Sequence, residues 1–367
     1  FRMEKEYKKL FSFPEKNSSK RLMFKRKKKE KKINIDEDLK KCKPRKIQKE
    51  FSRPFVSSFS GHQDCILKVK SHPLHPSLIF SGASDGEIKF WLINEKKCLK
   101  SLKAHEKFIR GLDIDHNGNF IISCSDDCFL KLWEISEFGK YPRISFKGRG
   151  PIDSLSSHPR DLIFATGGQE MLIWDQIHFK PIQRLIWGVS SISGIKFNPI
   201  EHNIIISTGS DRSVVLYDLR LQLPVKKFVM EMRSNDVCWN QLISSEFTLA
   251  NEDSNLYTFD LRNLSQVKKV HQGHVLPVLS LAQDLKNQDL VSGSLDSTIR
   301  TFPKSPAQKS EVFFSQRMYR VLSICFSTDE RHILSGSEDG NLRLWKRIVE
   351  YPKELNLTKT KKKNEQN

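Results

Sequence analysis

The stretch "SGASDGEIKFW" (81–91) places a small polar turn, built around Asp85, in front of a run that alternates between polar and apolar residues. An alternating run, a polar turn and a second alternating run predict a β-hairpin. The pattern returns six more times, and each copy ends on an aromatic residue. Those closing positions are 91, 133, 174, 217, 259, 302 and 345, so the copies lie 41 to 43 residues apart.

This spacing indicates an internal repeat. The other copies are "SCSDDCFLKLW" (123–133), "ATGGQEMLIW" ending at Trp174, "STGSDRSVVLY" (207–217), "LANEDSNLYTF" (249–259), "SGSLDSTIRTF" (292–302) and "SGSEDGNLRLW" (335–345). In three copies a Gly-His or Ala-His pair lies 22 or 23 residues before the turn Asp. A period of about 40–45 residues with a G-H…W-D signature is typical of four-stranded propeller blades. Residues 55–347 therefore resemble the WD-repeat family, which implies an all-β, seven-bladed β-propeller.

The resemblance also implies a buried hydrogen-bonded network in each complete blade, formed by a His, a small hydroxyl residue, the turn Asp and the closing aromatic. A buried charge needs partners, so a repeated Asp is interpreted as scaffold and not as a catalytic group. In the third set Phe302 replaces the Trp and cannot donate an indole N–H, so a weaker network is expected there. The three sets are His62, Ser81, Asp85 and Trp91; His105, Ser123, Asp127 and Trp133; and His274, Ser292 and Asp296 with Phe302.

Ring closure can be predicted from the two ends of the repeat. The last copy ends at Trp345 without a following outer strand, whereas "PFVSSF" (54–59) precedes the first Gly-His as a strand without a partner. Pairing the two would remove an open sheet edge. We therefore expect a basic, disordered tail (1–53), a propeller closed by its own N-terminal strand (54–347) and a short basic tail (348–367).

The net charge of +19 is concentrated in these tails. Residues 1–53 contribute +13 and residues 346–367 contribute +4, whereas the region between them contributes only +2. A run such as "KRLMFKRKKKEKK" (20–32) is typical of nuclear import or of contact with a nucleic-acid backbone, and the alternative is a solvated tail without partners. The basic candidates in this run are Lys25, Arg26, Lys27, Lys28, Lys29, Lys31 and Lys32.

Enzymatic and metal-binding signatures are absent from the sequence. It contains no H-E-x-x-H, P-loop or G-x-G-x-x-G motif, and its G-x-S-x-G match (residues 82–86) is the polar turn of the first repeat copy. Cys124 and Cys128 have no second Cys/His pair near them, so a zinc site is not expected and both are interpreted as small core residues. Seven scattered cysteines suit a reducing compartment, and no apolar run approaches the roughly 20 residues of a bilayer-spanning helix. We expect no cofactor, no catalytic residue, no membrane contact and no small-molecule substrate.

The segment "ANEDSNLYTFDLR" (250–262) looks at first like an acidic site, but Asp253 occupies the repeated turn position. Its remaining residues are not explained by the repeat. Together with "WGVSSISGIKFNPIE" (187–201) they resemble the suppressor-of-fibrillarin (Sof-like) family of WD-repeat proteins. The resemblance implies a non-catalytic, nucleolar component of the small-subunit processome. Such a component is monomeric within a large complex and acts on pre-rRNA beside a box C/D small nucleolar RNP. The partner-binding candidates are Asn251, Glu252, Asn255, Asp260 and Arg262.

A different class of function is also compatible with the sequence. "YDLR" (217–220) and "FDLR" (259–262) resemble the WDxR box through which some propellers dock on the adaptor of a cullin–RING ubiquitin ligase. Arg220 and Arg262 would then lie on the docking surface. The alternative for both arginines is a local salt bridge within the propeller.

Overall fold

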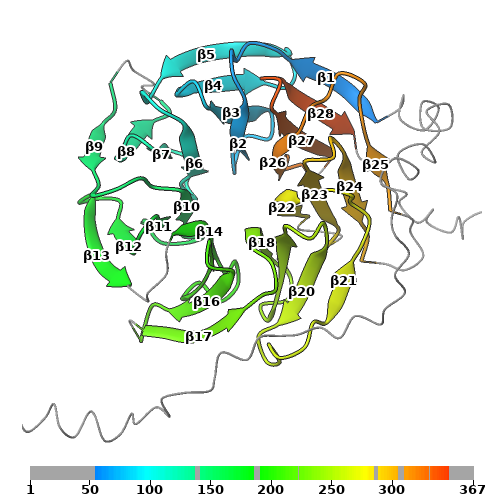
Figure 1. Cartoon of the computed structure of the whole chain (residues 1–367). Coiled ribbons are helices and arrows are strands. Elements are labelled where there is room, and N and C mark those ends of the chain that lie inside the picture. The colour runs from blue at the N-terminus through cyan, green and yellow to red at the C-terminus, as the bar shows by residue number, and fades with distance from the viewer. Residues whose placement is uncertain are drawn as a thin grey trace, which may run out of the picture.

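Seven four-stranded antiparallel sheets form a ring around a central channel, as Figure 1 shows. The computed structural model describes residues 54–136, 141–185, 191–221, 223–284, 288–304, 310–329 and 331–346. All the regular secondary structure within those ranges is β-strand. The prediction of an all-β, seven-bladed propeller is confirmed.

Each blade runs from an innermost strand beside the channel to an outermost strand at the rim. Blades 1 to 4 consist of β2 (Ile66–Ser71), β3 (Leu78–Ala83), β4 (Glu87–Leu92) and β5 (Lys97–Lys103); β6 (Ile109–Ile114), β7 (Phe120–Ser125), β8 (Phe129–Glu134) and β9 (Ile144–Lys147); β10 (Ser154–Ser157), β11 (Ile163–Gly167), β12 (Met171–Asp175) and β13 (Lys180–Leu185); and β14 (Ile192–Phe197), β15 (Ile204–Gly209), β16 (Ser213–Asp218) and β17 (Leu223–Val229). Blades 5 to 7 consist of β18 (Ser234–Trp239), β19 (Glu246–Asn251), β20 (Leu256–Asp260) and β21 (Lys269–His271); β22 (Val278–Gln283), β23 (Leu290–Ser294), β24 (Ile299–Phe302) and β25 (Val312–Phe313); and β26 (Val321–Phe326), β27 (His332–Ser337), β28 (Leu342–Lys346) and β1 (Phe55–Phe59).

The second and third strands of a blade meet in a tight turn that carries the repeated Asp. In blade 1, Asp85 Oδ1 accepts the backbone N–H of Glu87 at 2.8 Å, and Gly86 between them has a φ of 79°. A side chain that bonds its own backbone two residues on stabilises such a turn, and the left-handed residue lets the chain reverse. In six blades the residue after the Asp is left-handed: Gly86, Cys128, Arg212, Ser254, Ser297 and Gly340.

The antiparallel order of the strands gives the propeller two different faces. Turns between the second and third strands share one face with the connections between blades, and we call it the turn-Asp face because it carries Asp85 and its equivalents. Turns between the first and second strands and between the third and fourth strands lie on the opposite face. We call that one the DLR face because Arg220 and Arg262 follow β16 and β20 there.

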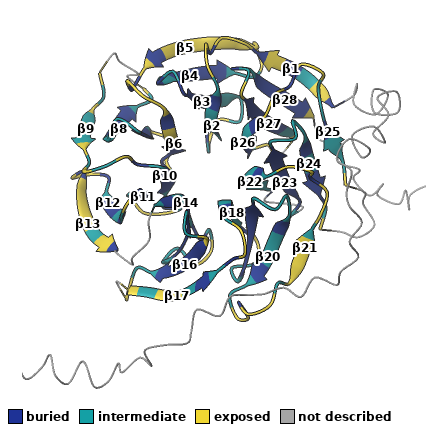
Figure 2. Ribbon diagram, viewed as in Figure 1, coloured by how far each residue is buried: buried dark blue, intermediate teal, exposed yellow. Residues whose placement is uncertain are grey.

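The hydrophobic core is divided among the seven interfaces between neighbouring blades. Seven clusters of buried apolar side chains each combine residues of two adjacent blades. Since the core lies between blades, the strands inside each blade are more buried than those at the rim. Figure 2 shows that much of the outermost strands β5, β13 and β17 is exposed. A blade therefore buries its two apolar faces only when both neighbours are present.

Strand β1 closes the ring by pairing with β28 of the last blade. The pairing is antiparallel and places Phe55 opposite Trp345 and Phe59 opposite Leu342. Phe59 is 3% exposed and belongs to the cluster between blades 7 and 1. The predicted closure by an N-terminal strand is confirmed, and it covers an edge that would otherwise expose unpaired backbone groups.

The cysteines of the described residues are free thiols. Cys124 lies buried in β7, whereas Cys128 is half-buried in the turn after Asp127. Cys128 is thus a turn residue and not the core residue that its spacing from Cys124 suggested. Among the described residues, no helix is long and apolar enough to cross a membrane.

Candidate functional site

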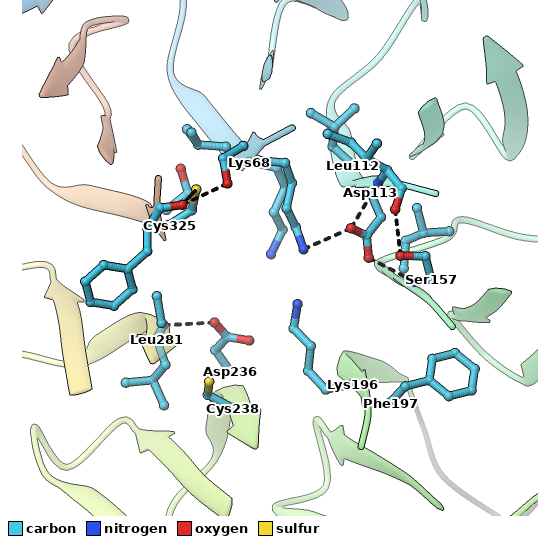
Figure 3. A pocket seen from close by; sticks show the side chains of 18 of the residues that line it. Lys68, Leu112, Asp113, Ser157, Lys196, Phe197, Asp236, Cys238, Leu281 and Cys325 are labelled. Atoms are coloured by element: carbon cyan, nitrogen blue, oxygen red, sulfur yellow. Dashed lines mark hydrogen bonds and ion pairs between the residues drawn. The ribbon is translucent and has the colours of Figure 1, made fainter. Parts of the chain in front are cut away.

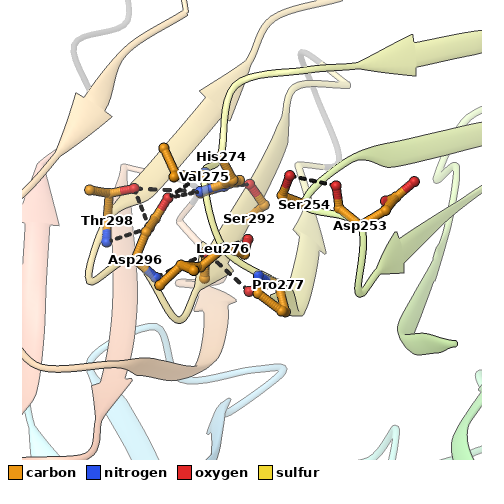
Figure 4. A network of polar contacts seen from close by, with 10 residues as sticks. Asp253, Ser254, His274, Val275, Leu276, Pro277, Ser292, Asp296 and Thr298 are labelled. Carbon is orange, nitrogen blue, oxygen red and sulfur yellow. Dashed lines mark hydrogen bonds and ion pairs between the residues drawn. The ribbon is translucent and has the colours of Figure 1, made fainter. Parts of the chain in front are cut away.

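The blade 6 network brings His274, Ser292 and Asp296 together, as Figure 4 shows. His274 Nδ1 lies 2.9 Å from Asp296 Oδ2, and His274 Nε2 lies 2.6 Å from Ser292 Oγ. The imidazole is fully buried, and the carboxylate also accepts the backbone N–H of Thr298. Burial disfavours the charged form of Asp296, but the hydrogen bonds from His274 and Thr298 together outweigh it and lower the pKa of the carboxyl group. The bond between His274 and Asp296 holds the turn against the connection from blade 5.

Blade 2 contains the same network with its indole present. His105 Nδ1 lies 2.9 Å from Asp127 Oδ2, and His105 Nε2 lies 2.8 Å from Ser123 Oγ. Trp133 Nε1 donates to the same hydroxyl at 3.0 Å. Burial opposes ionisation of Asp127, but the bond from His105 and nearby backbone N–H groups lower its pKa to about 2. In blade 6 Phe302 donates nothing to Ser292, as expected from its side chain.

In blade 1 the corresponding network is looser. His62 Nε2 and Trp91 Nε1 both lie 2.7 Å from Ser81 Oγ, but His62 Nδ1 is 3.7 Å from Asp85 Oδ2. Burial lowers the pKa of His62 to about 4, so the ring is neutral at pH 7. His62, Asp85 and Glu87 offer ligand atoms within 4.8 Å of one another. Three ligands with the Lys89 ammonium 3.2 Å from Glu87 Oε2 make a poor cation site, because the ammonium already neutralises that carboxylate.

Blades without the histidine supply other side-chain partners to the turn Asp. In blade 7, Arg343 from β28 forms an ion pair with Asp339. In blade 5, the Tyr257 hydroxyl of β20 donates to Asp253. In blade 4, Lys227 Nζ of β17 lies 3.3 Å from Asp211 Oδ2. The repeat predicted the aspartates but not these partners. Their sequence signal is a donor four residues after the Asp in blades 5 and 7.

The segment 250–262 is divided between the two faces. The turn between β19 and β20 carries Glu252 and Asn255 on the turn-Asp face, whereas Asp260 and Arg262 follow β20 on the DLR face. A strand of five residues separates the two ends by roughly 13 Å at 3.3 Å per residue. A partner that docks flat on one face contacts only one half of the segment.

The candidates on the turn-Asp face differ in accessibility. Asn251 is 1% exposed, and its side-chain oxygen accepts the N–H of Glu252 at 2.7 Å. Its contribution to a partner surface is therefore indirect, through the shape of the turn. Glu252 and Asn255 are half-buried at the turn itself. These two side chains are the accessible part of the predicted surface.

Arg220 and Arg262 are both exposed on the DLR face. Asp218 and Asp260 accept their backbone N–H groups at 2.9 and 3.0 Å, which fixes equivalent turns in blades 4 and 5. The Arg220 guanidinium donates to the Asn203 side-chain oxygen at 2.7 and 3.1 Å. Among the described residues, neither guanidinium forms an ion pair with a carboxylate. The predicted local salt bridges are therefore not formed within this part of the chain.

The central channel is a third candidate, which the sequence did not indicate. Its cavity has a volume of about 470 Å³ and is lined by the innermost strands and by loops of the DLR face. Figure 3 shows Lys68, Asp113, Lys196 and Asp236 around it, and Lys196 points towards its middle. Alternate residues of an innermost strand face the channel, so the lining comes from distant parts of the sequence.

The basic candidates Lys25, Arg26, Lys27, Lys28, Lys29, Lys31 and Lys32 lie outside the described residues. Their predicted contact with a nucleic-acid backbone or the import machinery stays a prediction. The propeller itself has no comparable excess of positive charge in its sequence.

Comparison with known proteins defines the class first. The family described as "WD domain, G-beta repeat" matches residues 53–91, 96–134, 265–302 and 312–346. The WD40 β-propeller domain of Doa1 has the same fold, with a TM-score of 0.70 and 18% identity over 80% of this chain and 96% of that one. Both findings identify a WD-repeat β-propeller.

Relatives in sequence define the family. DDB1- and CUL4-associated factor 13 of Xenopus tropicalis is 39% identical, over 82% of this chain and 68% of its own length. The protein of that name from Homo sapiens is 37% identical over the same shares. Protein SOF1 of Saccharomyces cerevisiae is 34% identical, over 87% of this chain and 71% of its own. The chain belongs to the family of Sof1-like WD-repeat proteins, as its sequence predicted.

Proposed function

We propose that the protein is a non-catalytic scaffold in ribosome biogenesis. In this role it is a nucleolar component of the small-subunit processome and supports early pre-rRNA cleavage beside a box C/D small nucleolar RNP. The observation that carries the proposal is the 34% identity to Protein SOF1 over 347 aligned residues, which covers 87% of this chain. The family-specific strings at 187–201 and 250–262 lie within that match.

The side chains of the described residues suit a binding platform better than catalysis. The buried His–Asp pairs recur in several blades and hold turns in place. Burial raises the pKa of Cys238 to about 12 and also raises that of Cys325, which disfavours the thiolate form that a nucleophile needs. Periodic His–Asp hydrogen bonds and neutral thiols fit a scaffold.

Two separated faces allow the propeller to bridge partners. Glu252 and Asn255 offer one polar surface on the turn-Asp face, whereas Asp260 and Arg262 offer another on the DLR face. The basic run 20–32 would add contacts to RNA phosphates without sequence specificity. A component that holds two neighbours and one RNA segment fits a large ribonucleoprotein assembly.

Depletion and rescue test this proposal. Loss of the protein should lower small-subunit rRNA and leave unprocessed precursor, with large-subunit rRNA little changed, as measured by RNA blotting. The wild-type chain and Asn94→Ala/Glu95→Ala, an exposed Asn-Glu pair in blade 1, should restore processing. Glu252→Ala/Asn255→Ala should restore it incompletely. Normal precursor levels after depletion would refute the proposal.

A second candidate function is that of a substrate receptor for a cullin–RING ubiquitin ligase. Arg220 and Arg262 favour it, because both guanidinium groups are exposed on one face without a carboxylate partner among the described residues. Relatives carry the name DDB1- and CUL4-associated factor 13. Equivalent turns in adjacent blades present the two arginines in the same way.

Capture of purified DDB1 by the immobilised full chain tests the second candidate. Arg220→Ala/Arg262→Ala should abolish capture, since both charge-bearing donors are removed from the docking face. Arg160→Ala, an exposed arginine on the same face in blade 3, is the matched control and should capture normally. Absence of capture by the wild-type chain, or undiminished capture by the double variant, would eliminate this function.

A further inference from the structure

The central channel gathers five charged side chains from four innermost strands. Lys68 and Lys70 come from β2, Asp113 from β6, Lys196 from β14 and Asp236 from β18. Three ammonium groups and two carboxylates give these strands a surplus of one positive charge. Asp115, in the loop after β6, also lines the cavity and lies 3.0 Å from His116 Nδ1. A group of charges removed from bulk water is costly unless each finds a partner.

The two carboxylates already have partners in the protein. Asp113 Oδ1 lies 3.0 Å from Lys70 Nζ, and Asp113 Oδ2 accepts the backbone N–H of Ser157 at 2.9 Å. Asp236 accepts the backbone N–H groups of Val237 and Leu281, each at 2.9 Å. Both aspartates therefore link one blade to the next as well as carrying charge.

Two of the three lysines lack such a partner. Among the described residues, neither Lys68 nor Lys196 forms an ion pair with a carboxylate, whereas Lys70 is paired with Asp113. Repulsion from Lys70, together with burial, lowers the pKa of Lys196 to about 8. Figure 3 shows the Lys196 side chain directed into the channel and not out to bulk solvent. Lys68 and Lys196 thus face a water-accessible cavity without a carboxylate of the described residues within ion-pair distance.

The cavity has room for a ligand and an entrance. Its volume of about 470 Å³ falls in the range of roughly 300–1,000 Å³ that is usual for small-molecule sites. Pro73, His116 and Pro159 of the loops after the innermost strands line its DLR end. A ligand entering from the DLR face meets the lysines at its leading end, with space behind for an attached group.

We propose that the DLR end of the channel binds a phosphate dianion, either free or as the terminal group of a phosphomonoester, between Lys68, Lys70 and Lys196. Three ammonium groups can each donate to a different oxygen of one phosphate group, whereas a carboxylate offers only two oxygens. Lysines act on phosphate as point charges and do not require the planar geometry of a guanidinium. The site is independent of the proposed function, because none of its residues lies on the surfaces assigned to partners.

Isothermal titration calorimetry of the full chain in low-chloride buffer tests the site, with inorganic phosphate and with O-phosphoserine as probes. Lys68→Gln and Lys196→Gln should each weaken binding by at least about tenfold, the loss expected when one hydrogen bond to a charged group is removed. Lys196→Arg should retain binding. Lys226→Gln, an exposed lysine of β17, is the matched control and should bind as the wild type does. The basic run 20–32 is present in every variant, so a loss in the channel variants cannot come from the tail.

Thermal denaturation without ligand establishes that each variant is folded before titration. If both probes bind saturably and both glutamine variants weaken that binding, the site takes the terminal phosphate of a phosphomonoester. Binding of inorganic phosphate alone, with the same dependence on both lysines, supports a site for the free ion. Absence of saturable binding to the wild-type chain, or equal binding by the wild type and both glutamine variants, would overturn the proposal.

Discussion

The turn aspartates show that the constraint at this position is a hydrogen-bond donor for the carboxylate and not one residue type. The partly buried carboxylate is bonded by His105 in blade 2, by Arg343 in blade 7 and by the Tyr257 hydroxyl in blade 5. His105 precedes its blade, whereas Arg343 and Tyr257 lie on the third strand of theirs, four residues after the Asp. Loss of the histidine from a repeat is therefore no sign that the network is lost.

Removing one member of a complete network should be costly. His274→Ala is expected to lower the free energy of unfolding by about 2–4 kcal/mol, because it leaves Asp296 buried and charged without its partner. His178→Ala is the control, since His178 pairs with Asp175 but its side chain is 71% exposed. That surface pair should contribute less than about 1 kcal/mol. Urea denaturation of the two variants measures both; equal losses would contradict the burial argument.

Stability should fall as the pH drops from about 6.5 to about 4. Burial lowers the pKa of His62 and of His271 to about 4 in the folded chain, whereas the unfolded value is about 6.5. Between these limits the unfolded chain binds more protons, so acid favours unfolding by up to roughly 1.4 kcal/mol per pH unit for each such histidine. His62→Gln should make the pH dependence from urea denaturation shallower. An unchanged slope would show that His62 titrates normally in the folded chain.

Among the strands, β1 is short but decides whether the ring of blades is closed. Its five residues complete the fourth strand of blade 7 and join the two ends of the repeat array. Every other blade is built from consecutive strands. Opening the ring at this point exposes the edge of β28 and one face of the cluster that contains Phe59.

Two phenylalanines of β1 test the closure within one strand. Phe59→Ala should lower the free energy of unfolding by about 3–5 kcal/mol, because Phe59 is 3% exposed in the closing cluster. Phe55→Ala removes a ring that is 41% exposed and contacts the edge of Trp345, so a loss of about 1 kcal/mol is expected. Chemical denaturation distinguishes the two. A small effect of Phe59→Ala would mean that the ring is closed by something other than β1.

At this scale the sequence was sufficient for most of the fold. A period of 41 to 43 residues predicts the number of blades, and the unpaired strand at 54–59 predicts the closure, because each blade depends only on its neighbours. The substitute partners Arg343 and Tyr257 were missed because the repeat signature describes what the blades share. The face on which a residue lies follows only from the strand it terminates, which is why Glu252 and Arg262 looked adjacent.

For the whole molecule, closing the ring creates the central channel, whose lining comes from several blades. Lys70, Asp113 and Lys196 are separated by more than 40 residues in sequence, yet the ring brings them around one channel. Each lies on the innermost strand of a different blade and outside the repeated turn signature, so the repeat pattern offered no reason to group them. The two outer faces have the same origin, since their surfaces are assembled from turns of successive blades.

The central claim is that these faces serve a scaffold in ribosome biogenesis. Affinity purification of the full chain, with RNA sequencing and mass spectrometry of what it retains, tests the claim most directly. We expect enrichment of small-subunit pre-rRNA and box C/D small nucleolar RNA over large-subunit precursors. The Glu252→Ala/Asn255→Ala variant should retain less of both than Asn94→Ala/Glu95→Ala. Recovery of cullin–RING ligase subunits without any enrichment of precursor RNA would contradict it.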